Sequence, residues 1–143
     1  MRKKENDTMM SPTTAARWFR RMMWLGIFAN LALALPTIAA PGMMIDMAGL
    51  PTATPELWPR FAGLLLVLLS IFYTPAATDI DRYRVVCWFA LLSRLAGVLF
   101  FAVEGSPYLL FGLFDFVFLV PQAILLVIAV RGADAPVAGA RAV

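Results

Sequence analysis

Four long runs of apolar residues dominate the chain, and short polar or proline-containing segments separate them. The runs cover residues 18–38, 58–74, 83–103 and 108–130. Each holds about 17–23 residues, which lets a helix cross a hydrocarbon core roughly 30 Å thick. Proline lacks an N–H donor and interrupts helices, and seven prolines mark the predicted joints: Pro36, Pro41, Pro51, Pro55, Pro59, Pro75 and Pro107. The pattern therefore predicts an all-α integral membrane protein, a four-helix bundle with up-down-up-down topology.

The longest predicted connection, residues 39–57, carries an apolar segment that is too short to span a membrane. Residues 43–50 of this connection are typical of a short helix lying at the membrane interface. Three methionines within it, Met43, Met44 and Met47, offer thioethers that suit Cu(I). No cysteine or histidine stands beside them. We therefore expect these side chains to fill apolar space at the membrane interface rather than to bind copper.

The distribution of basic residues predicts the orientation of the bundle. In the four-span arrangement ten of them share one side: Arg2, Lys3, Lys4, Arg17, Arg20, Arg21, Arg82, Arg84, Arg131 and Arg141. Arg60 lies on the opposite side. Because Lys and Arg favour the cytoplasmic side, we expect both termini in the cytoplasm. A cleaved signal peptide is the alternative for the first run, but that run exceeds the usual core of about 7–15 residues.

Tryptophan and tyrosine residues fall near the predicted membrane–water interfaces: Trp18, Trp24, Trp58, Tyr73, Tyr83, Trp88 and Tyr108. Amphipathic rings settle at that depth in membrane proteins. We expect these side chains to anchor the helices.

Composition narrows the functions that such a bundle can have. Of the 143 residues, 62% are hydrophobic and 15% are charged, whereas a soluble domain is roughly a quarter charged. The net charge of +3 does not indicate nucleic-acid binding, because the basic residues flank apolar runs. The chain has no histidine and one cysteine, Cys87, so it lacks the commonest metal ligand and general base. We expect one membrane domain over 15–131, a polar tail at 1–14, a flexible tail at 132–143, no cofactor and no enzymatic activity.

Arg94 is the main polar feature, because it lies in the middle of the third apolar run. A charge at that depth costs about 3 kcal/mol on insertion scales and needs a buried partner or water. Asp115 is the acid inside the fourth run. At 1.5 Å per residue the two lie about 13 Å and 10 Å below the outer surface, on either side of a short hairpin loop. We therefore expect them to pair.

A wider polar cluster is predicted around this pair. Asn30 lies at a similar depth on the first run, and we expect Arg60 and Glu104 at the outer mouth. Two interpretations stay open. The pair either staples two helices, since breaking a buried pair costs about 3–5 kcal/mol, or lines a pocket for a substrate, a proton or a lipid headgroup. The staple is favoured because no second acid or histidine extends the cluster.

A seven-residue pattern occurs in both the second and the third run, at 60–66 and 94–100. An inverted repeat of the kind found in transporters is one explanation. The favoured explanation is close packing of helices through the small residues Ala62, Gly63, Ala96 and Gly97. Pro121-Gln122 in the fourth run is also interpreted as a packing feature, at a kink.

Several short motifs carry a resemblance to a known family. They are Pro59-Arg60-x-x-Gly63, Tyr73, Ala76-Ala77-x-Asp79, Arg82-x-Arg84, Arg94-x-x-Gly97 and Asp115-x-x-Phe118. Over about two-thirds of its length the chain resembles DoxX-like and other small four-span bacterial membrane proteins. The resemblance implies a four-helix bundle in a bacterial inner membrane, sometimes serving as an accessory to a redox system. It carries over no catalytic residues.

These observations favour an accessory or assembly subunit of a larger inner-membrane complex, acting by packing of its transmembrane helices. The alternative is a small carrier or binder of a lipophilic or anionic molecule, with Arg94 and Arg60 as anion contacts. A quinone- or copper-linked redox subunit is a third hypothesis. The expected partners are the lipid bilayer and other membrane subunits, or a second copy of the chain, and no nucleic acid.

Overall fold

The computed structural model describes residues 10–133, and all regular elements within that range are helices. They are α1 (Pro12–Ala39), α2 (Pro41–Met47), α3 (Leu57–Thr78), α4 (Arg84–Glu104) and α5 (Leu109–Ala133). All except the short α2 are long and apolar enough to cross a membrane. The predicted all-α fold with four candidate spans is therefore confirmed.

The helices extend further than the apolar runs indicate. Helix α1 begins at Pro12 because Ser11 caps it, with its hydroxyl oxygen accepting from the backbone N–H of Thr14 at 3.3 Å. Proline suits the first turn of a helix, because the N–H group that it lacks would have no intrahelical acceptor there. Three residues of the predicted N-terminal tail are thus helical, and α5 likewise continues to Ala133. The remainder of both predicted tails, apart from residues 10 and 11, lies outside the described residues.

Four of the prolines predicted to mark joints lie within the helix bounds, and Pro41 among them begins α2. Pro59 lies in the first turn of α3, where helical N–H groups have no intrahelical acceptor. Pro36 and Pro75 lie near the ends of α1 and α3. Their carbonyl oxygens still accept hydrogen bonds, from Ala40 N at 2.8 Å and Asp79 N at 3.1 Å. One more turn of helix therefore follows each proline.

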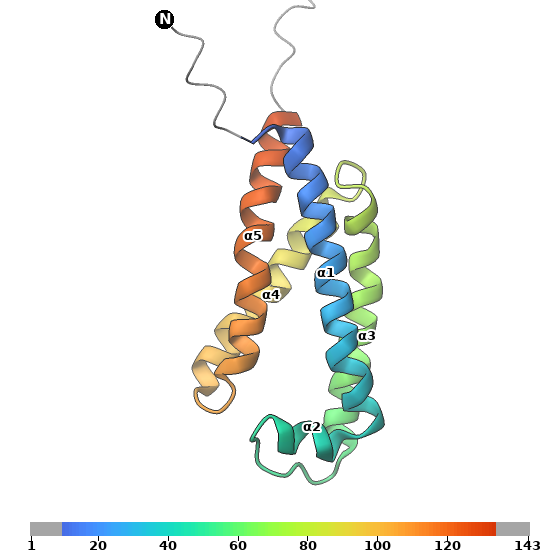
Figure 1. Ribbon diagram of the computed structural model, residues 1–143, viewed down its shortest axis with the longest axis vertical. Coiled ribbons are helices and arrows are strands. Elements are labelled where there is room, and N and C mark those ends of the chain that lie inside the picture. Colours follow the sequence, from blue (N-terminus) through green and yellow to red (C-terminus); the bar gives the residue numbers. More distant parts are fainter. Residues whose placement is uncertain (1–9, 134–143) are drawn as a thin grey trace, which may run out of the picture.

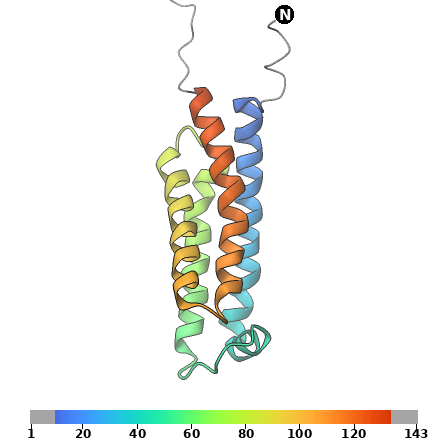
Figure 2. The same ribbon diagram turned by 90° about the vertical axis from the view of Figure 1, so that its left-hand side faces the viewer.

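The long helices form two pairs, and the pairs diverge towards one end of the bundle. Helix α1 packs most closely on α3 and α5, and α4 packs on α5, whereas α3 and α4 touch only slightly. Figure 1 shows that α1 begins and α5 ends at one end of the bundle, beside the α3–α4 connection. Helix α2 and the α4–α5 connection lie at the other end, which we call the α2 end (Figures 1 and 2).

The tightly packed core lies in the half away from α2. Its largest members are Phe19, Met23, Tyr73 and Leu126, all buried between the helices. Exposed side chains on the outside of the helices are largely apolar, which suits contact with lipid. The α2 half of the bundle is packed less densely and encloses the candidate site.

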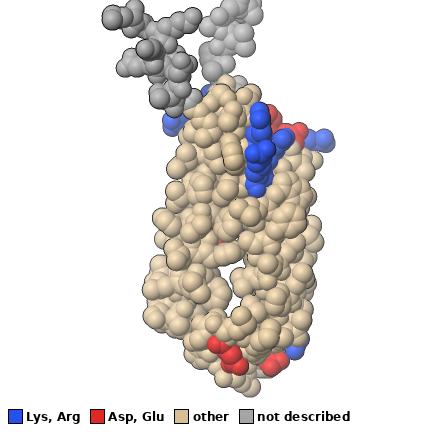
Figure 3. Space-filling view, in the orientation of Figure 1, with Lys and Arg blue, Asp and Glu red and all other residues tan. Residues whose placement is uncertain are grey.

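Charge is distributed unequally between the two ends (Figure 3). The end where α1 begins carries the described arginines of the α1 start, the α3–α4 connection and the α5 end: Arg17, Arg20, Arg21, Arg82, Arg84 and Arg131. We call this the basic end. At the α2 end, Arg60 stands among the acidic residues Asp46, Glu56 and Glu104.

Candidate functional site

A cavity of about 1010 Å³ lies between the helices in the half of the bundle nearest α2. All five helices contribute to its wall, because the α1–α3 and α4–α5 pairs diverge there. Figure 3 shows the surface hollowed through at this level. Sites for small molecules usually measure about 300–1,000 Å³. The cavity is therefore large enough for a sizeable ligand or a segment of lipid chain.

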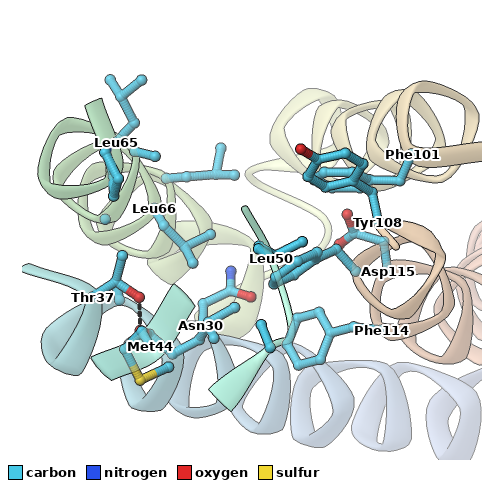
Figure 4. A pocket seen from close by; sticks show the side chains of 18 of the residues that line it. Asn30, Thr37, Met44, Leu50, Leu65, Leu66, Phe101, Tyr108, Phe114 and Asp115 are labelled. Carbon is cyan, nitrogen blue, oxygen red and sulfur yellow. Dashed lines mark hydrogen bonds between the residues drawn. The ribbon is translucent and has the colours of Figure 1, made fainter. Parts of the chain in front are cut away.

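Most of the cavity wall is apolar. Helix α3 supplies a row of leucines and Phe72, and the opposite side carries Phe101, Phe111 and Phe114. Helix α2 and the loop after it close one end with Met44, Ile45, Leu50 and Pro51. In Figure 4, Leu50, Leu66 and Phe114 point towards the same central space from three different segments. The predicted short helix in the 39–57 connection thus exists and forms part of a binding-sized enclosure.

Polar side chains gather at the deep end of the cavity, towards the middle of the bundle. They come from four helices: Asn30 from α1, Tyr73 from α3, Ser93 and Arg94 from α4, and Asp115 from α5. Among the described residues of the lining, Arg94 and Asp115 are the charged ones. The site therefore combines a long apolar chamber with one compact polar end.

Arg94 and Asp115 form the ion pair expected from the sequence. Arg94 Nη1 lies 3.1 Å from Asp115 Oδ1, the arginine side chain is 3% exposed and the aspartate 22% exposed. The guanidinium also stands 4.8 Å from the ring centre of Phe118 and 5.8 Å from that of Tyr73. Aromatic faces attract cations at such distances. The positive charge is thus held between a carboxylate and two rings, and it is not exposed to lipid.

Two glycines make room for this pair. A methyl group on Gly26 would lie 2.6 Å from Arg94 Nη2, and one on Gly97 would overlap the Asp115 carboxylate. Gly97 was predicted to pack against another helix. Its neighbour across the helix interface is the Asp115 side chain. Gly63 faces α1 instead, with Ile38 and the carbonyl oxygen of Ala34 closest to it. Gly63 and Gly97, the two glycines predicted to pack helices, therefore both contact helices of their own chain.

Asn30 is the most unusual polar group of the site. Its side chain is 1% exposed, and its Oδ1 atom has no hydrogen-bond partner among the described residues. A buried polar atom without a partner costs free energy. In Figure 4 the amide points from α1 into the cavity. The site thus contains a hydrogen-bonding group that a ligand in the cavity would satisfy.

Tyr73 and Ser93 extend the polar end in a way that the sequence analysis missed. Tyr73 was expected at an interface, but its side chain is 1% exposed and its hydroxyl hydrogen-bonds Ser93. The spacing of Gly63, Ser70, Tyr73 and Ala77 holds the signal, because these buried residues follow one face of α3. Small and polar residues on one face of an otherwise leucine-rich helix indicate a face turned to the bundle interior.

Gln122 was interpreted as packing and proves to be a buried polar contact. It is fully buried on α5, and its Nε2 donates to the carbonyl oxygen of Met22 on α1 at 3.2 Å. The same nitrogen lies 3.4 Å from the position that a Cβ on Gly26 would occupy. The close contact of α1 with α5 beside Arg94 therefore depends on Gly26 and Gln122 together.

Arg60 and Glu104 do not join the polar group at the deep end. Arg60 donates to the carbonyl oxygen of Ile38 at 2.6 Å and pairs with Glu56 at 3.1 Å, so it caps the C-terminal end of α1. Carbonyl groups in the last turn of a helix lack intrahelical donors, which explains the attraction of the guanidinium. Glu104 ends α4 as an exposed side chain. Neither residue lines the cavity.

The structure divides the three methionines considered as copper ligands. Met44 lines the cavity, whereas Met43 and Met47 are 54% and 75% exposed. Within residues 10–133, no group of three or more His, Cys, Asp or Glu side chains is placed to hold a metal.

No protein-family model, curated protein or solved structure matches this chain.

Proposed function

We propose that this protein binds an amphipathic small molecule within the membrane, with the hydrophobic body in the chamber and the polar group at the deep end. The observation that carries the proposal is the unpaired Asn30 Oδ1 in the wall of a cavity of about 1010 Å³. A buried polar group without a partner is unfavourable in an empty apolar cavity. A ligand that supplies the missing hydrogen bond stabilises this arrangement.

The Arg94–Asp115 pair supports binding as well as packing. A staple alone needs the two side chains to meet, and they do so at 3.1 Å. The pair also lines the cavity, and Arg94 Nε has no hydrogen-bond partner among the described residues. Ionisable residues within membrane helices commonly mark substrate pathways. We therefore interpret the pair as both a staple and the polar wall of the site.

The proposal includes an orientation in the membrane. The basic end faces the cytoplasm, because Lys and Arg favour that side. The bundle is then an up-down-up-down arrangement with both termini inside, in a bacterial inner membrane. Helix α2 lies at the outer interface, and the cavity occupies the outer half of the bilayer. An amphipathic molecule enters sideways, between the loosely touching helices α3 and α4.

Mass spectrometry of co-purifying small molecules tests the proposal. The full chain is purified from its native membrane in a mild detergent, alongside two variants. Leu66→Trp fills the cavity, and Leu64→Trp places the same ring on a lipid-facing position outside the lining. We expect the wild type and Leu64→Trp to retain a defined small molecule and Leu66→Trp to lose it. Retention of the same molecule by Leu66→Trp contradicts the proposal.

The second candidate is an accessory subunit of a larger membrane complex, which stays a prediction, as does the DoxX-like resemblance. Gly63 and Gly97, the glycines suggested for contacts with a partner, pack against their own chain. Other outer faces carry large apolar side chains, which suit a partner helix and lipid equally. The same purification distinguishes the two functions. Large subunits at a fixed ratio, without a small molecule sensitive to Leu66→Trp, favour the accessory role.

A further inference from the structure

We infer that the cavity selects an uncharged, hydroxyl-bearing lipid with a single hydrocarbon chain over its anionic counterpart. This inference rests on the proposed function and specifies its ligand. Three properties of the site carry it: the charge of the polar end, its hydrogen-bonding groups and the shape of the apolar chamber.

The polar end is electrically balanced. Arg94 and Asp115 are the charged side chains among the described lining residues, and they pair at 3.1 Å. An anionic headgroup would have to displace the aspartate from the arginine or remain as an uncompensated charge. A charge removed from water without a partner is strongly unfavourable. The site therefore disfavours an ionised phosphate or carboxylate, although it contains an arginine.

The hydrogen-bonding groups of the site require a ligand that both donates and accepts. Asn30 Oδ1 is an acceptor without a donor, and the Asp115 carboxylate is partly exposed to the cavity with one oxygen free of Arg94. The amide nitrogen of Asn30 is a donor and points into the same space (Figure 4). A hydroxyl group satisfies both kinds of partner, whereas a fully ionised phosphate accepts only. A carbonyl group without a hydroxyl likewise leaves both acceptors unpaired.

The chamber beyond the polar end fits a hydrocarbon chain. Its wall is mainly apolar, with leucines from α3 facing phenylalanines from α4 and α5. Its volume of about 1010 Å³ lies at the upper end of the range for small-molecule sites. The opening in the surface at this level gives a chain a route from the bilayer (Figure 3). A single-chain lipid therefore places its hydroxyls beside Asn30 and Asp115 with its chain in the chamber.

Competition between two lipids that differ by one phosphate tests the inference. The purified full chain in maltoside micelles is incubated with tritiated 1-oleoylglycerol, and bound lipid is measured by scintillation proximity. Unlabelled 1-oleoylglycerol and 1-oleoyl-lysophosphatidic acid then compete. We expect 1-oleoylglycerol to compete at least tenfold better. Equal or better competition by the anionic lipid overturns the inference and leaves the cavity as a binding site. If neither lipid shows binding that Leu66→Trp removes, the inference fails, and the co-purification experiment decides the proposed function separately.

Removal of the negative charge provides a second arm. Asp115→Asn leaves Arg94 unneutralised, so we expect preference to shift about tenfold towards lysophosphatidic acid. Asp46→Asn is the matched control, because Asp46 is exposed on α2 and lies outside the lining. An unchanged preference in folded Asp115→Asn contradicts the argument from charge.

A third arm keeps the test decisive if Asp115→Asn does not fold. Asn30→Leu preserves the ion pair and removes the unpaired amide, and we expect about tenfold weaker binding of 1-oleoylglycerol. Ser70→Ala is its control, since Ser70 is buried but bonds only within α3, to the carbonyl oxygen of Leu66. Binding by Asn30→Leu at wild-type strength overturns the role of the amide.

Discussion

At the scale of single residues, the burial of Arg94 sets the properties of the site. Its guanidinium is 3% exposed and meets Asp115, Phe118 and Tyr73 within one layer of the bundle. A buried ion pair does not by itself stabilise a protein relative to a well-packed apolar pair. Removing only one of the two charges is strongly destabilising, because the remaining charge then has no partner. The contribution of the pair to stability therefore differs from its contribution to binding.

A double-mutant cycle separates these contributions. Arg94→Met leaves Asp115, which is 22% exposed, without its cation inside the bundle, and we expect the free energy of unfolding to fall by about 3 kcal/mol. Arg94→Met combined with Asp115→Leu removes both charges, and we expect most of that loss to be recovered. Unfolding by a denaturing detergent in mixed micelles measures both. Binding of 1-oleoylglycerol remains impaired in the double variant, because the polar end has lost its Asp115 acceptor.

The exposed ion pair between Arg60 and Glu56 at the α2 end provides a comparison with the Arg94–Asp115 pair. Arg60 and Glu56 are 45% and 56% exposed, and such pairs contribute roughly 0–1 kcal/mol. We expect Arg60→Met to lower stability by about 1 kcal/mol, mainly through loss of its hydrogen bond to the α1 carbonyl of Ile38. A loss as large as that of Arg94→Met would show that the two arginines act alike, contrary to the structure.

At the scale of elements, close contact between α1 and α3 depends on Gly63. A Cβ there would lie 2.8 Å from Ile38 Cγ1 and 3.0 Å from the backbone carbonyl oxygen of Ala34. A backbone atom in a packed helix cannot move aside without moving the helix. The pair therefore has a fixed separation, and that separation defines one wall of the cavity.

A single added methyl group tests this contact. We expect Gly63→Ala to push α1 away from α3 and to lower the free energy of unfolding by about 1–3 kcal/mol, as overpacking does. Gly42→Ala is the matched control, because its new Cβ meets only Glu56 Oε1 at 3.6 Å, an ordinary contact. Detergent denaturation measures both variants. Equal stability of Gly63→Ala and wild type would show that the α1–α3 contact yields easily.

Sequence patterns predict the elements better than they predict the site. Length and hydropathy locate four spans, because a membrane demands both. The predicted second span ends at residue 74, before Pro75, whereas α3 continues to Thr78, since a proline one turn from a terminus removes few hydrogen bonds. The estimated depths of Arg94 and Asp115 below the membrane surface predict that they pair. Such an estimate does not show which face of a helix a residue occupies. Tyr73 was therefore assigned to an interface.

The cavity itself has no local signal in the sequence. It arises because α1 packs on both α3 and α5, while α3 and α4 touch little. That difference depends on which faces meet, at Gly63 on one side and at Gly26 and Gln122 on the other. All four runs are strongly apolar, so their hydropathy does not show which helix faces meet. The contact made by Arg60 has no local signal for a related reason, because its hydrogen bond to the α1 C-terminal carbonyl of Ile38 is a tertiary contact.

At the scale of the whole molecule, the two ends differ in charge and in packing. The basic end is densely packed and carries most of the described arginines, whereas the α2 end carries the cavity and the acidic residues Asp46, Glu56 and Glu104. In the proposed orientation the basic end faces the cytoplasm, because Lys and Arg favour that side. That orientation would place the proposed lipid-binding cavity in the outer half of the bilayer. The orientation thus decides which leaflet supplies the ligand.

Labelling of introduced cysteines tests this orientation. Cys87 is fully buried, so it gives little background with a membrane-impermeant maleimide. Thr54 and Asp81 are exposed, one in the connection beside α2 and the other in the α3–α4 connection at the basic end. We expect Thr54→Cys to be labelled in intact spheroplasts and Asp81→Cys only after the membrane is opened. The reverse pattern would place the cavity in the inner leaflet and the termini outside. Its ligand would then come from the cytoplasmic side, whereas the selection for a hydroxyl headgroup would stand, because it depends on Asn30 and the Arg94–Asp115 pair rather than on orientation.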